Sequence, residues 1–165
     1  MLEIIKSRRS VRSYENKSIS KDDLKELLEA GMYAPSAGNE QAWQFIVLEG
    51  EVLKKYLELN KNVPQSAPFG ILVCMDWSQE KYKGMNMPFV DCAAATQNIL
   101  LLAHSKGLGA IWTAIFENVK SEVKKLLNLP EHIEPFSFIP VGYSKENNRE
   151  TPKRYDEKKI HYNKW

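Results

Sequence analysis

Three arginines and two serines lie within six residues near the start of the chain, from Ser7 to Arg12. The guanidinium groups of Arg8, Arg9 and Arg12 are planar forks of donors that match the oxygens of a phosphate group. Ser10 adds a short hydroxyl donor. Arginines are also common in solvated surface loops, which is the alternative interpretation. The segment therefore predicts an anion site.

A second segment, Ala34 to Gln41, combines turn-forming residues with side-chain amides. The amides of Asn39 and Gln41 suit the polar edge of a flat heteroaromatic ring. Turn-forming residues also gather in loops for local reasons alone, so an ordinary loop is the alternative. Together the two segments predict a cofactor that carries a phosphate and a ring, and flavin mononucleotide (FMN) fits best.

These two segments and a third one, Gly107–Trp112, resemble in their order and spacing the three hallmark motifs of the nitroreductase family. The resemblance runs over the whole chain and departs at Ala42, where the family often has proline. It implies that Arg8 and Ser10 contact the phosphate of FMN, and that Arg12 lies near the pyrimidine edge of the ring. A fixed cation there would stabilise the negative charge of reduced flavin.

The resemblance assigns further residues to the same cofactor. Pro35, Ser36 and Ala37 resemble the segment that lies along the flavin, on a cofactor held mainly by the other subunit. Asn39 and Gln41 resemble the polar residues beside that segment. The remaining residues that it implies are Arg9 at the anion site, Thr113 and Ala114 through their backbone, and Lys153 or Arg154 as a terminal phosphate-binding base. A solvated tail is the alternative for the last pair.

Other chemistries find no support in the sequence. No third glycine follows Gly107-Leu108-Gly109, since Trp112 stands in its place, and the segment follows a predicted helix, so it is not a dinucleotide-binding fingerprint. The three histidines are far apart and match no metal-ligand spacing. We expect His104 to be a packed core histidine. No nucleophile elbow, P-loop or pair of catalytic carboxylates stands out.

Size and composition indicate an ordinary globular protein. A chain of 165 residues predicts a single domain, 1–165. A net charge of +2, from 23 basic and 21 acidic residues, is too small to indicate nucleic acid or an anionic membrane as a partner. The sequence lacks a signal peptide and any apolar run near the ~20 residues that cross a bilayer, so we expect a cytoplasmic protein. Cys74 and Cys92 are expected to be buried structural thiols.

Periodicity and capping residues predict alternating helices and strands. Ser20 is the expected N-cap of a helix over 21–33, and Asp91 that of a very apolar helix over 92–106. The other predicted helices are 52–59 and 119–127, and the predicted strands are 43–48, 69–75, 108–113 and 136–143. The resemblance implies an α+β fold with three α/β/α layers around a central mixed, mainly antiparallel sheet.

The tail, residues 144–165, is polar and has no clear element, which is unusual inside a compact domain. One explanation is that it packs on another subunit. The resemblance implies the same: an obligate homodimer with FMN at the subunit interface and a terminal segment that embraces the partner.

The function that we predict is an FMN-dependent oxidoreductase with no catalytic side chain. Hydride would pass from NAD(P)H through flavin N5 to an electron-poor acceptor, such as a nitroaromatic or a quinone, by a ping-pong mechanism. One alternative is a non-catalytic flavin-binding or sensor protein of the same fold. Another is a module that binds a phosphorylated ligand or nucleic acid through the N-terminal arginines, against which the near-neutral net charge argues.

Overall fold

A five-stranded sheet forms the centre of the molecule in the computed structural model, which describes residues 1–146 and 150–165. The strands are β1 (Trp43–Glu49), β2 (Phe69–Asp76), β3 (Gly109–Ala110), β4 (Thr113–Ala114) and β5 (Ile133–Gly142). The order is β1-β2-β5-β3, and β4 also pairs with β5. All these pairs are antiparallel, whereas an isolated bridge beyond β3 is parallel. The sheet is therefore mixed and mainly antiparallel, which confirms that prediction.

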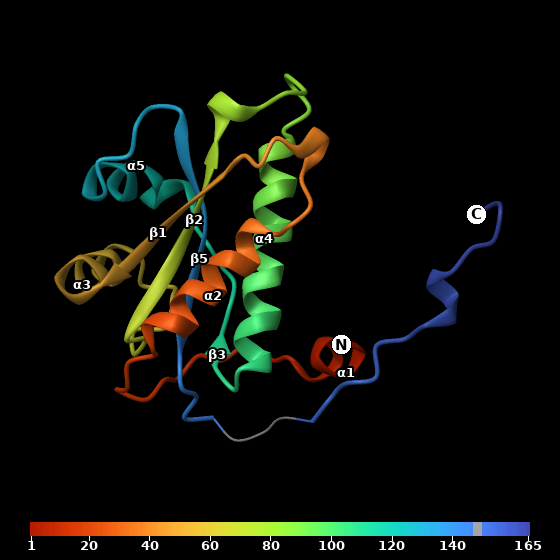
Figure 1. Cartoon of the computed structure of the whole chain (residues 1–165), viewed down its shortest axis with the longest axis horizontal. Coiled ribbons are helices and arrows are strands. Elements are labelled where there is room, and N and C mark those ends of the chain that lie inside the picture. The colour runs from red at the N-terminus through yellow and green to blue at the C-terminus, as the bar shows by residue number, and fades with distance from the viewer. Residues whose placement is uncertain (147–149) are drawn as a thin grey trace.

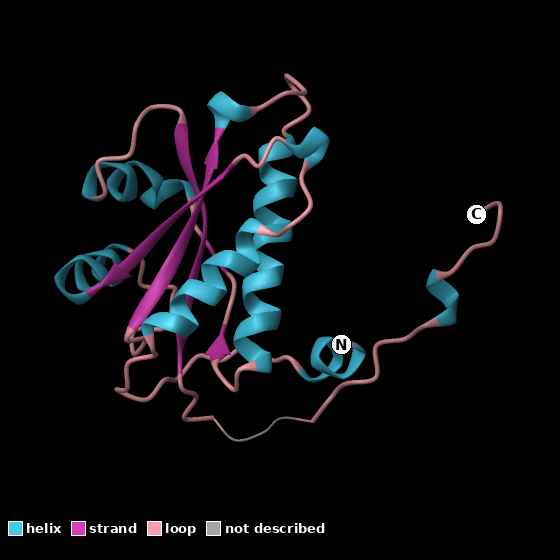
Figure 2. Cartoon of the chain, in the orientation of Figure 1, coloured by secondary structure: helices cyan, strands magenta, loops and turns pink. Residues whose placement is uncertain are grey.

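Helices cover both faces of the sheet and make three layers (Figures 1 and 2). On one face α2 (Lys21–Met32) packs on α4 (Met87–Ser105), which lies along the sheet. On the other face lie α3 (Gly50–Leu59) and α5 (Glu117–Leu126). The remaining helical elements are the short α1 (Leu2–Ser7) and three 3-10 turns, η1 (Ala37–Asn39), η2 (Trp77–Gln79) and η3 (Glu157–Lys159). The α+β class is confirmed.

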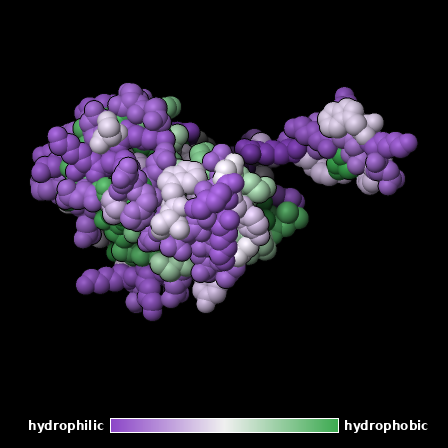
Figure 3. Space-filling model, turned by 90° about the horizontal axis from the view of Figure 1, so that it is seen from above, coloured by the Kyte–Doolittle hydropathy of each residue, from purple (hydrophilic) through white to green (hydrophobic). Residues whose placement is uncertain are grey.

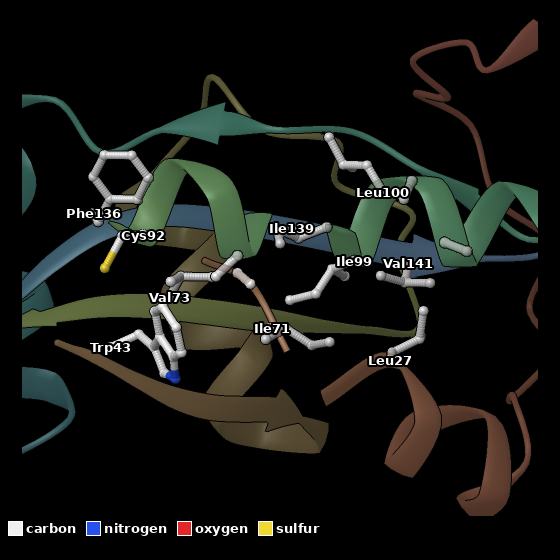
Figure 4. Packing of buried hydrophobic residues seen from close by; sticks show 14 of the residues in the cluster. Leu27, Trp43, Ile71, Val73, Cys92, Ile99, Leu100, Phe136, Ile139 and Val141 are labelled. Atoms are coloured by element: carbon white, nitrogen blue, oxygen red, sulfur yellow. The ribbon is translucent and has the colours of Figure 1, made fainter. Parts of the chain in front are cut away.

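Strand β2 supplies both cores, because alternate side chains of a strand point to opposite faces. Ile71 and Val73 belong to the cluster with α2 and α4, which Figure 4 shows in close view. Leu72 and Cys74 belong to the cluster with α3 and α5. All eight residues of β2 are buried, as a continuous apolar run predicts. Cys92 on α4 is buried as well, so both free thiols lie in the core, as expected.

The predicted start of the apolar helix is wrong, whereas that of the first long helix is right. The Ser20 Oγ accepts a hydrogen bond from the Asp23 N–H at 2.9 Å and caps α2. Helix α4, however, begins at Met87, with Asn86 as its N-cap and Pro88 in its first turn. Proline is pre-organised for that position, so the helix starts one turn before Asp91. Asp91 is then a buried residue within α4.

The single strand predicted over 108–113 is two short strands. Gly109 pairs with Gly142 and Ala110 with Val141, and then Thr113 pairs with Phe138. The register is continuous, which sets residue 111 opposite Pro140. Proline has no N–H to donate, and the ladder is interrupted there.

The tail leaves the body of the molecule. Residues 150–165 are exposed throughout and contain only the short turn η3 (Figure 1). No helix within 1–146 or 150–165 combines the length and the apolar character needed to cross a membrane.

We predict that Gly70→Ala lowers the free energy of unfolding by about 1–3 kcal/mol, because an added Cβ would overlap the fully buried ring of Phe138. Phe138 itself packs against Tyr56 at 4.4 Å between ring centroids, so it has little room to move. Denaturant unfolding would measure the change. Phe138→Leu in the same chain should recover part of the loss, and costs that simply add would contradict the overlap.

Candidate functional site

The basic segment near the N-terminus runs along β3. Ser10 forms the parallel bridge with Ala110, and the Val11 N–H donates to the Ala110 carbonyl at 3.1 Å. Such a close approach needs the glycine at 109, where a Cβ would lie 2.7 Å from the Val11 Cγ1 atom. The first and third sequence motifs therefore lie side by side in the fold.

Two residues that the sequence analysis missed hold this segment in place. The Tyr14 hydroxyl donates to the Val11 carbonyl at 2.7 Å and contacts the Pro140 carbonyl at 3.2 Å. The Glu146 Oε1 atom accepts from the N–H groups of Arg12 at 2.6 Å and of Ser13 at 3.0 Å. Neither position belongs to a motif. Glu146 acts across more than 130 residues, and Tyr14 joins the nearby Val11 carbonyl to the distant Pro140 carbonyl.

The positive charges of Arg9 and Arg154 act on Arg8, and none of these three has a carboxylate partner among the described residues. Partial burial, followed by the positive charges of Arg154 and Arg9, lowers the pKa of Arg8. Within residues 1–146 and 150–165, no ion pair joins any of the three to a carboxylate. A partly buried cation with further positive charges beside it and no paired carboxylate favours a bound anion. Both predicted tail residues are exposed, and of the two only Arg154 is among the charges that lower the pKa of Arg8.

Arg9 uses most of its donors within the protein. Its guanidinium donates to the carbonyls of Lys6 at 2.8 Å and of Arg8 at 2.5 Å. The Nε and Nη2 atoms both donate to the Glu150 carbonyl, at 3.2 and 3.1 Å. One of its five N–H donors is left over. Arg9 therefore fastens the tail to the N-terminal segment.

Strand β4 continues the edge of the sheet that β3 begins, since both strands pair with β5. The Thr113 Oγ1 donates to the Phe138 carbonyl at 2.7 Å, so this side chain is engaged, whereas Ala114 is exposed. Next to it, Trp112 lies 5.5 Å from Phe136 between ring centroids, and Phe89 meets Phe136 edge-to-face at 4.8 Å. Phe89 and Trp112 are both exposed, which leaves an aromatic wall beside β4.

The predicted turn has a strained backbone and free amides. Gly38, Asn39 and Gln41 have φ values of 52°, 55° and 51°. Positive φ is rare in residues other than glycine and, apart from asparagine, marks strain that the surroundings must maintain. The side chains of Asn39 and Gln41 are exposed and make no hydrogen bond within the described ranges. Pro35 is exposed, and the half-buried Ser36 accepts from the Gln41 N–H through its Oγ at 3.1 Å.

Neighbouring elements hold the turn. The Asp91 Oδ1 atom accepts from the Ala37 N–H at 2.9 Å. The Lys81 N–H donates to the Glu40 Oε2 atom at 2.8 Å, and the Lys81 Nζ atom donates to the Gly38 carbonyl at 2.8 Å. The turn is therefore tied to α4 on one side and to the segment after β2 on the other.

The basic segment and the turn lie at opposite ends of α4 (Figure 1). Ser7 meets His104 in the last turn of this helix, at 2.7 Å between Oγ and Nε2, whereas Ala37 meets Asp91 near its start. At 1.5 Å per residue the two anchor points are about 20 Å apart. One chain thus brings the first and third motifs together and keeps the second apart from both.

His104 differs from the core histidine that we expected. It is half-buried at the end of α4 and hydrogen-bonds to the exposed Ser7. Burial, and then the charges of Arg8 and Arg9, lower its pKa. His104 is therefore a neighbour of the arginine cluster and senses its charge.

Comparison with known proteins matches all of these segments. The nitroreductase family model matches residues 5–66 and 51–143. A Methanothermobacter thermautotrophicus protein, provisionally named NADH dehydrogenase/NAD(P)H nitroreductase, is 42% identical over 170 residues, 100% of this chain and 87% of that protein. A solved structure from Clostridium acetobutylicum, provisionally named NADH oxidase, has a TM-score of 0.91 and 39% identity and covers 98% of this chain and 99% of that one. A structure named FMN-dependent nitroreductase, from Clostridium difficile R20291, has a TM-score of 0.88 at 26% identity and covers 100% of both chains.

We predict that Arg8→Gln raises the pKa of His104 toward its ordinary value, because it removes one of the two positive charges that lower it. Inorganic phosphate should move this pKa in the same direction in the wild-type protein. The NMR titration of the imidazole would measure both shifts. Arg12→Gln is the control, because Arg12 is not among the charges that act on His104. A pKa that phosphate leaves unchanged would contradict an anion site here.

Proposed function

The chain belongs to the nitroreductase family and shares its class, the NAD(P)H-dependent oxidoreductases, and from this premise we propose that it works through FMN bound between two copies of the chain. The observation that carries the proposal is the cluster of Arg8, Arg9 and Arg154, which has no carboxylate partner among the described residues. The structure with 26% identity is named as FMN-dependent, which supports the same cofactor.

The phosphate of FMN would bind to Arg8, Ser10 and Arg154. These residues fit a dianion, because guanidinium groups and a hydroxyl supply only donors to it. Arg9 would contribute its remaining N–H and its charge while it fastens the tail that carries Arg154. Lys153 would stay at the rim, since, unlike Arg154, it is not among the charges that act on Arg8.

The ring would extend from the phosphate along β4. Arg12, whose backbone is held by Glu146, would place its guanidinium at the pyrimidine edge and stabilise the anionic reduced ring. The backbone of Thr113 and Ala114 would meet the other polar edge, because β4 pairs with β5 on one side only among the described strands. Trp112 and its aromatic neighbours would border the space where substrates stack.

The turn that completes the site would come from the second copy. Within one chain it lies about 20 Å from the basic segment, at the far end of α4. A two-fold axis beside α4 would set Pro35, Ser36 and Ala37 of one copy against the ring held by the other. The exposed amides of Asn39 and Gln41 would then supply donors and acceptors to that ring.

Exposed apolar residues support such an interface. Met1, Ile4, Tyr33 and Leu101 line a groove between α1, α2 and α4. Tyr33 is 86% exposed, although it lies at the end of a packed helix. Figure 3 shows apolar side chains at the surface of the body on the side from which the tail projects. The tail, 150–165, would pack on the partner and cover its own exposed aromatic residues.

Bound FMN would supply the redox chemistry, hydride transfer at N5 between NAD(P)H and an electron-poor acceptor of the nitroaromatic or quinone type in a ping-pong cycle. The protein would bind, orient and tune the ring. None of its side chains is needed as a catalytic acid or base, since solvent can supply the protons.

We predict that the purified protein is yellow and contains about one FMN per chain, because a two-fold interface holds two equivalent sites. Arg8→Ala should weaken FMN binding about 10- to 100-fold through the loss of a charge-assisted pair. Lys6→Ala is the matched control, because it removes the same charge nearby but breaks only an exposed ion pair to Glu3. A colourless protein that FMN cannot reconstitute, or equal affinity in the Arg8 and Lys6 variants, would contradict the proposal.

A further inference from the structure

Two carboxyl groups that the sequence did not pair are buried together beneath the turn. Glu40 belongs to the turn and is 5% exposed, and Asp91 belongs to α4 and is 2% exposed. They lie 51 positions apart in the sequence, and no motif links them. Isolated carboxylates are rarely buried so deeply, because burial disfavours the charged form strongly.

Each group uses one oxygen and leaves the other without a partner. The Asp91 Oδ1 atom accepts from the Ala37 N–H at 2.9 Å, and the Glu40 Oε2 atom accepts from the Lys81 N–H at 2.8 Å. The remaining two oxygens, Oδ2 of Asp91 and Oε1 of Glu40, are buried and receive no donor within the described ranges. Buried polar atoms without partners are rare. Here Asp91 bonds to Ala37, three residues before Glu40 in the same turn, and the two carboxyl groups interact.

We propose that Glu40 and Asp91 share one proton, and that the resulting O–H···O bond fixes the strained turn on α4. Two ionised carboxylates are both acceptors and repel each other, whereas one acid and one carboxylate satisfy both free oxygens. One proton binds to the pair of carboxylates and no other covalent bond changes. The pair then carries a single negative charge.

The electrostatics of the site agree with this geometry. Burial raises the pKa of Asp91, and the charge of Glu40 and a hydrogen bond to it raise this pKa further, against the opposing effects of the backbone N–H groups of Ala37 and Ala42. An acid whose pKa is higher in the folded state binds its proton more tightly there. Folding stability must then fall as the pH rises through that pKa, because the folded protein releases the proton last.

The other ionisable groups around the pair would not take over this role. The Lys81 ammonium is exposed and donates to the Gly38 carbonyl. Burial raises the pKa of the thiols of Cys92 and Cys74, in Cys74 to about 12, so both stay neutral. Glu80, next to Lys81 in the chain, also has a buried oxygen without a partner and is therefore the appropriate control.

The consequence for the cofactor rests on the proposed function. With the proton in place, Glu40 is bonded to Asp91 on α4, and the backbone of Asn39 and Gln41 beside it keeps its positive φ. Loss of the proton would leave two carboxylates that repel each other. The Ala37 N–H would still donate to Asp91, but the Glu40 end of the turn would loosen, and FMN would lose one of its contacts. Glu40 and Asp91 are therefore positioning residues for the ring, and neither one touches it.

Carboxamide variants of the full-length protein test the shared proton directly. Either Asp91→Asn or Glu40→Gln keeps the oxygen that accepts the backbone N–H and supplies a permanent N–H to the other carboxylate. In the double variant the two NH₂ groups would face each other. We expect each single variant to match the wild type at pH 6 and to exceed it in the folding equilibrium constant at pH 9 by about tenfold, the factor of one pKa unit. The double variant should be less stable than either single variant at both pH values.

Denaturant unfolding at a fixed protein concentration measures these constants without any reference to FMN. Glu80→Gln should follow the wild type at both pH values. Two results would overturn the shared proton. In the first, the effects of the two single substitutions simply add in the double variant. In the second, the single variants are as unstable at pH 6 as an Asp91→Ala variant measured beside them.

The release rate of FMN, followed by its fluorescence at pH 6 and pH 9, tests whether the shared proton helps the turn to hold the ring. We expect release to accelerate with pH in the wild type and to stay level in the two single variants. If the stability pattern holds and FMN release does not follow it, the link to the ring is overturned while the shared proton stands. If no FMN binds, the proposed function fails, and the stability pattern still decides on the proton.

Discussion

The length of α4 is the constraint on which the functional account depends. This helix carries one anchor for the basic segment at its end, where Ser7 meets His104, and another for the turn near its start, where Asp91 holds Ala37. A rigid element of this length keeps the two segments that we propose to bind the cofactor about 20 Å apart in each chain. A second copy in a two-fold arrangement would bring the basic segment of one chain next to the turn of the other. The proposed site would therefore be complete only in the proposed dimer.

The fold prepares both ends for this task through contacts that cross long stretches of sequence. Gly109 lets the basic segment lie on β3, and Tyr14 fixes its backbone. The result is a group of guanidiniums whose charges act on one another. The phosphate that we propose to bind there would relieve this repulsion. At the other end, backbone strain in the turn is balanced by bonds to Asp91 and Lys81. Both regions therefore keep a ligand-ready geometry at the expense of local stability.

The sequence predicted what local chemistry determines and missed what distant partners determine. Ser20 was sufficient to locate the start of α2, because a cap acts within three residues. The break between β3 and β4 depends on Pro140, which lies on another strand, and no pattern within 108–113 indicates it. Asp91 resembled a helix cap, but its partner is Ala37, more than fifty residues away. Arg9 was predicted at the anion site, and the structure adds that two of its donors bond the Glu150 carbonyl in the tail, a contact that composition could not reveal.

Complementation between two defective chains tests the central claim most directly. One chain would carry Arg8→Ala and the other Ala37→Trp, and the mixed dimer would be isolated with two different tags. If each site takes its phosphate ligands from one copy and its turn from the other, one of the two sites is intact. The mixed dimer should then bind about half the FMN of the wild type and recover NAD(P)H turnover, whereas neither parent dimer does. A mixed dimer as empty as its parents would show that each chain builds its site alone.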